Sequence, residues 1–306
     1  MTAKRAAIVI NPSKSTDVDF RAVLETQSKE NGWAEPLWLE TTVDDPGVGM
    51  AREALKAGVD VVLAAGGDGT VRCVAEVLAG TGIAMTVIPL GTGNLLARNL
   101  GINLADPEGA VRSAFGSTER SIDAVEIVLD HSQDKQIYAV MAGLGFDATI
   151  MADTDSDLKD KVGFLAYVDA GLRNLQGEPV KAKIHIDGGH TIRRRVRSVM
   201  GGNCGRVQGG LEVFPGAKID DGVLDLMVMA PSGAFGWVAV VAGIAGRIFG
   251  RSRAANPAVE YYTGTRVEIE VEKPQDIQLD GDHVGEASHV QMTLLPNALK
   301  IRGEFS

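Results

Sequence analysis

The chain has 306 residues, of which 45% are hydrophobic, 5% aromatic and 23% charged, with 37 glycines and two cysteines. Its 40 acidic and 30 basic side chains leave a net charge of −10, which argues against a general nucleic-acid binder and against an anchor held on anionic membrane by net charge. Cys73 and Cys204 lie far apart in the sequence, which argues against a metal knuckle or a disulfide framework and favours a reducing cytosol.

The first 120 residues alternate short apolar runs with helical patterns. Strands are predicted at residues 6–10, 36–39, 60–65 and 85–89, and helices at residues 18–31, 47–57, 71–78 and 95–100. Strands that are apolar along their whole length and separated by helices indicate a parallel sheet with both faces covered. Ligands of such sheets bind beyond the carboxyl ends of the strands, and two glycine-rich turns of this chain are expected there.

From about residue 122 the pattern changes to alternating strands separated by glycine or polar turns. We predict strands at residues 124–129, 136–141, 181–186, 193–200, 224–229, 266–271 and 290–295, with helices near residues 158–175 and 234–249. This pattern favours a second, mainly antiparallel domain that begins near Ser121. The apolar stretch 234–250 is shorter than the ~20 residues that span a bilayer and is interrupted by glycines, so we expect a soluble protein.

The first glycine-rich turn, Gly66-Gly67-Asp68-Gly69-Thr70, follows the third predicted strand. Glycines let backbone N–H groups approach phosphate oxygens, and Thr70 adds a hydroxyl where the next helix is expected to begin. A carboxylate does not attract phosphate, so Asp68 is expected to bind a magnesium ion that bridges phosphates. The alternative is an ordinary strand-to-helix turn in which Asp68 is the N-cap.

The second glycine-rich turn, Gly91-Thr92-Gly93-Asn94, repeats this arrangement after the fourth predicted strand. Two such turns after successive strands would border one nucleotide site. Asn11-Pro12-Ser13, after the first strand, is either a third edge of that site or a helix entry. Neither of the two glycine-rich turns is a Walker A loop, because no Gly-Lys-Ser/Thr follows either of them.

Three later stretches have a structural as well as a chemical interpretation. Residues 143–148 mimic a dinucleotide fingerprint but lack the downstream strand with an acidic end, so we interpret them as structural. The acids of residues 220–225 form either a solvated turn or a site for a hard metal. Residues 279–282 form either an Asp-Gly hairpin turn or a carboxylate presented to a substrate hydroxyl. His283 and His289 lack metal-binding spacing and are expected at the surface.

Together these motifs closely resemble the diacylglycerol kinase catalytic-domain family, which includes bacterial soluble diacylglycerol kinases and the sphingosine and ceramide kinases. The resemblance covers nearly the whole chain in order. It runs through Asn11-Pro12, residues 66–70, 91–94 and 143–146, Lys161-Val162-Gly163, residues 221–225 and Asp280-Gly281-Asp282. The first glycine turn alone is less specific, because NAD kinases and phosphofructokinases carry similar turns.

The resemblance implies a two-domain α/β kinase. Residues 1–121, joined again by residues from about 294 to 306, would form a nucleotide-binding α/β domain like that of NAD kinase and phosphofructokinase. Residues 122–293 would form a mainly antiparallel β-sandwich domain on the lipid side. The residues implied to contact the ATP cofactor are Asn11, Ser13, Thr41 (with Thr42 as the alternative), Gly66, Gly67, Asp68, Gly69, Thr70, Gly91, Thr92, Gly93 and Asn94.

The resemblance also implies the catalytic and metal-binding residues. Asp68 would hold the catalytic Mg²⁺, and Asp282 would accept the proton of the acceptor hydroxyl. Many relatives have glutamate at the latter position, so Asp282 is one methylene shorter, and nearby Glu286 is the alternative acid. A structural Mg²⁺ is implied at Asp221, with carbonyl ligands from Lys218 and Val223.

The implied activity is transfer of the γ-phosphate of ATP to the hydroxyl of diacylglycerol or a similar lipid, giving phosphatidic acid or an analogue. A soluble-metabolite kinase of the NAD kinase type and a non-catalytic regulatory protein with the same fold are the alternatives. The turn at residues 91–94 and the motif at residues 221–225 favour the lipid kinase, and intact Asp68 and Gly69 argue against a regulatory protein.

The expected partner is a lipid substrate at the inner membrane face, which a cytoplasmic, peripheral enzyme visits transiently. No nucleic-acid partner is expected, and a homodimer is left open. Arg193-Arg194-Arg195, with Arg197, would either meet anionic head groups or guard an exposed strand edge. We expect Asp68→Ala and Asp282→Ala to abolish lipid phosphorylation and to leave the fold intact.

Overall fold

A computed structural model describes residues 3–14, 16–145, 179–207, 212–231, 236 and 258–305 of the chain. The predicted helix near residues 158–175, nearly all of the one at 234–249, and the motif residues 146 and 161–163 lie outside these residues. Within the described part of the chain, no helix is long and apolar enough to cross a membrane.

The N-terminal part is the predicted parallel sheet. It contains the strands β1 (Ala6–Ile10), β2 (Leu37–Glu40), β3 (Val61–Gly66) and β4 (Ala84–Pro89), in the order β4-β3-β1-β2. Its helices are α1 (Phe20–Glu30), α2 (Val48–Lys56), α3 (Asp68–Leu78), α4 (Leu95–Leu100) and α5 (Pro107–Ser113). Ala7 and Val9 of β1 share a core with α2, α3 and α4, whereas Ile8 and Ile10 share one with α1 and α5. Both faces of the sheet are therefore covered, as the apolar strands predict.

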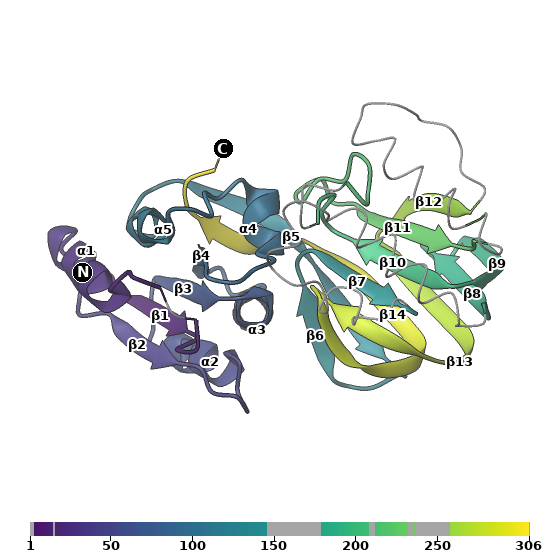
Figure 1. Cartoon of the computed structure of the whole chain (residues 1–306), viewed down its shortest axis with the longest axis horizontal. Coiled ribbons are helices and arrows are strands. Elements are labelled where there is room, and N and C mark those ends of the chain that lie inside the picture. The colour runs from purple at the N-terminus through teal and green to yellow at the C-terminus, as the bar shows by residue number, and fades with distance from the viewer. Residues whose placement is uncertain are drawn as a thin grey trace.

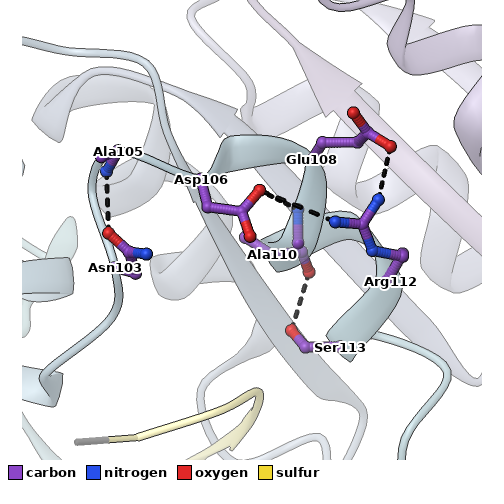
Figure 2. Close-up of polar contacts among 8 residues, drawn as sticks. Asn103, Ala105, Asp106, Glu108, Ala110, Arg112 and Ser113 are labelled. Carbon is purple, nitrogen blue, oxygen red and sulfur yellow. Dashed lines mark hydrogen bonds and ion pairs between the residues drawn. The ribbon is translucent and has the colours of Figure 1, made fainter.

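Helix α5 was not predicted, although its start carries a recognisable capping signal. Asp106 is its N-cap and accepts a hydrogen bond from the N–H of Gly109 (2.7 Å), and a proline follows at the first helical position. Arg112 pairs with Glu108 one turn earlier, and a guanidinium nitrogen lies 3.7 Å from Asp106 Oδ1. Figure 2 shows both contacts. Local capping and ion pairs thus support this short helix.

The remaining strands form a mainly antiparallel, curled sheet. They are β5 (Glu119–Leu129), β6 (Lys135–Tyr138), β7 (Met141–Leu144), β8 (Val180–Ile186), β9 (His190–Val196), β10 (Ser198–Gly202), β11 (Leu224–Met229), β12 (Val259–Gly264), β13 (Arg266–Leu279) and β14 (Asp282–Arg302). Their inward side chains enclose a third core, which includes Ile127, Leu226 and Ile269. The predicted fold class, an α/β part followed by an antiparallel sandwich, is confirmed.

Strand β14 joins the two parts of the molecule. Near its end it pairs in parallel with β4, through Lys300↔Ala84 and Ile301↔Met85. All fourteen strands that the structure describes therefore belong to one sheet, and the yellow C-terminal end of the chain returns to the α/β part (Figure 1). The predicted domain boundary near Ser121 falls inside β5.

Three predictions about the β-rich part are wrong in detail. The strand predicted at 136–141 is two strands, β6 and β7, because the N–H groups of Ala139 and Val140 turn away to donate to Asp280. The strand predicted at 193–200 is also two strands, since β9 pairs with β8 whereas β10 pairs with β7 and β11. His289 is buried rather than on the surface, with its Nε2 2.8 Å from Glu268 Oε1.

Candidate active site

A cleft forms where the two glycine-rich turns meet the hairpin between β13 and β14. Its volume is about 440 Å³. The residues that line it are Asn11, Lys14, Pro46, Gly67, Asp68, Gly69, Thr70, Gly91, Thr92, Gly93, Leu95, Asp280, Gly281 and Asp282. The chain therefore brings together residues that are about 270 positions apart, from Asn11 to Asp282, in a space of the size that small-molecule sites occupy.

The first glycine turn is already part of a helix. We predicted the helix to begin at residue 71, but α3 begins at Asp68, with Gly67 as its N-cap. Gly69 and Thr70 therefore lie in the first helical turn, where N–H groups have no partner within the helix. A Cβ atom on Gly69 would lie 2.7 Å from Asp282 Oδ2, so the missing side chain leaves room for the Asp282 carboxylate in its present position.

The second glycine turn packs directly against the first. A Cβ atom on Gly91 would lie 2.7 Å from the Cα atom of Gly67, so backbone meets backbone at this point. Asn94 holds the turn closed: its Oδ1 accepts from the Gly91 N–H (2.9 Å), and its Nδ2 donates to the Gly91 carbonyl (2.7 Å). Asn94 itself has a left-handed backbone, with φ 47°.

Asp68 connects the two turns. Its carboxylate accepts hydrogen bonds from the N–H groups of Asn94 (3.0 Å) and Leu95 (2.6 Å), at the start of α4. The alternative interpretation, in which Asp68 is the N-cap of its own helix, is therefore wrong: it lies in the first turn of α3 and caps the next helix. Burial raises the pKa of Asp68 above its usual value, and the negative charge of Asp282 raises it further. The two backbone hydrogen bonds lower the pKa but do not cancel this rise.

Asp282 lies at the start of β14 and is half-exposed in the cleft. Its Oδ2 lies 3.6 Å from a guanidinium nitrogen of Arg72, which belongs to α3 and is itself nearly buried. Arg72 also lies 3.9 Å from Glu76, one turn further along α3. Its Nε is buried and has no hydrogen-bond partner among the described residues. The alternative acid, Glu286, is not among the residues that line the cleft.

Arg72 was not predicted as a site residue, although the sequence around it carries a signal. Arg72 and Glu76 have the i, i+4 spacing of a helical ion pair, and Arg72 follows the first glycine turn by two residues. Its contact with Asp282 spans 210 positions, which no local pattern reveals. Lys14, also missed, lines the cleft beside Gly67, where a Cβ atom on Gly67 would lie 4.0 Å from Lys14 Cε.

Asp280 has a structural place beside Asp282. Its fully buried carboxylate accepts hydrogen bonds from the N–H groups of Ala139 (3.1 Å), Val140 (3.0 Å) and Met141 (2.8 Å). Burial raises the pKa of Asp280 to about 6, although these three bonds lower it. Asp280 thus fastens the hairpin to the connection between β6 and β7, and the turn it begins presents Asp282 to the cleft.

Asn11, Ser13 and Thr41 follow strand ends, as predicted, but only Asn11 lines the cleft. Asn11 Oδ1 accepts from both the N–H (3.0 Å) and the hydroxyl (2.7 Å) of Ser13. Ser13 therefore supports Asn11 rather than facing the cleft in this structure. Thr41 is buried, and its N–H donates to the carbonyl of Ile10 (2.9 Å).

The predicted second magnesium site lies in the turn before β11. Asp221 Oδ1 accepts from the N–H of Val223 (3.1 Å), and Asp220 pairs with Arg120 (2.8 Å). Burial raises the pKa of Asp225 to about 6, and the charge of Asp221 adds to this. Among the described residues, no three His, Cys, Asp or Glu side chains converge as metal ligands, and the predicted set has one carboxylate, Asp221, beside the carbonyls of Lys218 and Val223.

Known proteins similar to this chain match it along its length. The diacylglycerol kinase catalytic domain matches residues 5–127, and the YegS C-terminal NAD kinase beta sandwich-like domain matches residues 139–303. Proteins of Pseudomonas fluorescens and Pseudomonas putida, both described as probable lipid kinase YegS-like, are each 30% identical over 98% of this chain and 96% of their own length. The crystal structure of a diacylglycerol kinase from Bacillus anthracis matches with a TM-score of 0.72 at 22% identity, covering 99% of this chain and 98% of that one.

Proposed function

The chain belongs to the diacylglycerol kinase catalytic-domain family, and we propose from this that it transfers the γ-phosphate of ATP to the hydroxyl of diacylglycerol or a similar lipid. The product would be phosphatidic acid or an analogue. Family membership supports a kinase that uses ATP. The identity of the acceptor lipid is our proposal.

One observation carries the assignment of the site: Asp282 reaches the first glycine turn from the opposite part of the molecule. Its Oδ2 lies where a Cβ atom on Gly69 would come within 2.7 Å. Phosphoryl transfer needs the phosphate donor and a carboxylate near the acceptor in one place. The cleft supports this arrangement, because the glycine turns form one wall and Asp282 the other.

The glycine turns suit the phosphates of ATP for two reasons. Gly67, Gly69, Gly91 and Gly93 line the cleft without side chains, so bound phosphate oxygens could approach their backbone. The first turn is also the N-terminus of α3, an eleven-residue helix whose dipole favours negative charge. Lys14 adds a positive charge on the same wall.

The carboxylates of the cleft fit a divalent cation. Asp68 uses one lone pair on each oxygen for the N–H groups of Asn94 and Leu95, which leaves further lone pairs for a metal. Asp68 and Asp282 repel each other across the cleft, and a cation between them and the phosphates would relieve this repulsion. A magnesium ion held by Asp68 would neutralise charge on the phosphates. We also retain Asp221, with the carbonyls of Lys218 and Val223, as the proposed structural magnesium site.

Asp282 is the proposed proton acceptor. The acceptor oxygen bonds to the γ-phosphorus, the bond from that phosphorus to the bridging oxygen breaks, and ADP leaves. The proton of the hydroxyl passes to Asp282, which is exposed enough to return it to water. Asp282 is one methylene shorter than the glutamate of many relatives, and its contact with Arg72 keeps its carboxylate turned toward the cleft.

The lipid acceptor implies that the enzyme meets a membrane. We propose that it binds the inner membrane face transiently from the cytoplasm, as a peripheral protein. The state of association in solution, including a homodimer, does not enter the proposed chemistry.

The proposal is tested with purified protein, labelled ATP and a panel of acceptors: detergent-dispersed diacylglycerol, ceramide and sphingosine, and soluble NAD. We expect label on a lipid, no label with Asp282→Asn, and wild-type labelling with Asp134→Asn, which removes an exposed carboxylate elsewhere. Label on NAD alone would instead identify a soluble-metabolite kinase. Wild-type labelling by Asp282→Asn would show that another group accepts the proton.

A further inference from the structure

The outer face of the β-rich part carries charges arranged strand by strand. On this face β9 presents Arg193 and Arg195, β8 presents Lys181 and Lys183, and β13 presents Glu270 and Glu272; these six line a hollow of about 540 Å³. The register places Lys181 opposite Arg195, and Lys183 opposite Arg193. Two basic columns therefore lie side by side, with an acidic column on one side only.

The glutamates of the acidic column form ion pairs with the lysines of β8 and not with the arginines of β9. Lys181 lies 3.2 Å from Glu272, and Lys183 lies 3.4 Å from Glu270. Within the described residues, neither Arg193 nor Arg195 has an ion pair with a carboxylate; Arg195 donates to the carbonyl of Pro179 (3.0 Å). We name the exposed pair Arg193 and Arg195 the arginine column.

Arg194, between these two arginines on β9, does form an ion pair. Arg194 alternates to the other face of β9 and pairs with Glu260 of β12. Like charges directly opposite each other on neighbouring strands destabilise a sheet. Arg193 and Arg195 each face a lysine in this way, and the charge of Glu272 offsets this in part at Arg195, so an external anion would stabilise the arginine column.

The arginine column lies at a free edge of the sheet. Among the described strands β9 pairs with β8 alone, and both lie at the right-hand edge of the molecule in Figure 1. The Cα atoms of Arg193 and Arg195 are about 7 Å apart, since residues two positions apart on a strand are separated by about twice 3.3 Å. Guanidinium groups bind phosphate oxygens through paired hydrogen bonds.

We propose that the arginine column docks the protein on a bilayer that contains anionic phospholipids, by binding their phosphate head groups. This inference rests on the proposed function, which requires the enzyme to reach a lipid. Charge complementarity selects the occupant: the glutamates on β13, two strands in from the arginine column, confine the positive surface to a narrow strip, and the chain as a whole carries −10. Proteins that bind nucleic acid carry a basic excess over the whole domain, whereas this chain is acidic apart from such local strips, so head groups at a membrane surface are the better match.

The first measurement is co-sedimentation with vesicles of phosphatidylcholine, with and without phosphatidylglycerol. We expect wild type to bind the anionic vesicles, and Arg193→Gln/Arg195→Gln to lower the partition coefficient about 30-fold, equivalent to about 2 kcal/mol. The matched control, Lys29→Gln/Lys135→Gln, removes two exposed positive charges elsewhere and should bind like wild type. Arg193→Gln alone keeps the contact of Arg195 with Pro179 and should show a smaller loss, with an unchanged thermal midpoint.

The second measurement separates docking from catalysis. Phosphorylation of detergent-dispersed diacylglycerol should be the same in wild type and the double variant, whereas phosphorylation in anionic vesicles should fall in the double variant. Equal vesicle binding by the double variant and wild type would overturn the docking inference. The inference would also be overturned if the double variant lost binding to free inorganic phosphate or to nucleic acid but bound anionic vesicles like wild type. Intact vesicle binding without lipid phosphorylation in either format would instead overturn the proposed function.

Discussion

Asp280 offers a direct test of how the hairpin that carries Asp282 is held. The substitution Asp280→Asn keeps the size of the side chain and removes its charge. The carboxylate is fully buried and accepts three backbone N–H groups, whereas a carboxamide has one acceptor oxygen and places an NH₂ group among donors. At least one buried N–H therefore loses its partner, and each such loss costs roughly 1–3 kcal/mol.

The loss of unfolding free energy in Asp280→Asn depends on pH, because Asp280 titrates in the wild type. Burial raises the pKa of Asp280 from 3.8 to about 6, so the native state binds the proton more tightly than the unfolded state. This contribution to stability is complete below pH 3.8 and is lost as the pH rises through about 6. A difference of about two pH units corresponds to about 3 kcal/mol in total, of which about 1 kcal/mol is lost between pH 5 and pH 7.

The asparagine variant has no such titration. We therefore expect its free energy of unfolding, compared with wild type, to be lower by about 1 kcal/mol more at pH 5 than at pH 7. Urea unfolding of both proteins at the two pH values measures this, with Asp134→Asn as the control for loss of an exposed aspartate. A wild-type to Asp280→Asn difference that is the same at both pH values would refute the buried, proton-binding carboxylate.

Three further predictions concern the cleft. Gly91→Ala places a Cβ atom 2.7 Å from the Cα atom of Gly67, so it should lower both ATP affinity and the thermal midpoint, whereas Gly189→Ala, which meets no atom within 4 Å, should change neither. Asp282→Asn should abolish phosphoryl transfer and change the free energy of unfolding by less than about 0.5 kcal/mol, because the side chain is half-exposed; clear unfolding would contradict this. Arg72→Gln should lower kcat more than it raises the KM for ATP, and Arg72→Lys should restore part of the kcat; an equal loss in both variants would indicate a purely structural role.

The α/β part was predictable because its signals are local. Strands such as Val61–Gly66 are apolar along their whole length, and the glycines after them end each strand where a ligand site is expected. The β-rich part was less predictable, because its strand breaks depend on distant partners. The interruption between β6 and β7 exists because Asp280, about 140 positions away, accepts the N–H groups of Ala139 and Val140. No local pattern contains that information.

The same difference applies to the site. Asp68, Gly69 and Gly91 could be identified from the sequence, because each lies in a turn with a recognisable composition. The contact of Arg72 with Asp282 could not, because an arginine on a helix ordinarily faces solvent. The burial of His289 was missed for a similar reason: its partner Glu268 lies on the neighbouring strand, where only the register of β13 and β14 brings the two together.

Asp68 and Asp282 differ in how far their function can be separated from their contribution to stability. We expected Asp68→Ala and Asp282→Ala alike to leave the fold intact. Asp68, however, is the acceptor for two N–H groups at the start of α4, and removing a cap of this kind costs roughly 0.5–2 kcal/mol. Loss of activity in Asp68→Ala would therefore combine a lost metal ligand with a displaced second glycine turn. Asp282 makes no comparable backbone contact among the described residues, and its contact with Arg72 is the interaction that its substitution removes, so the substitution reports mainly on the chemistry.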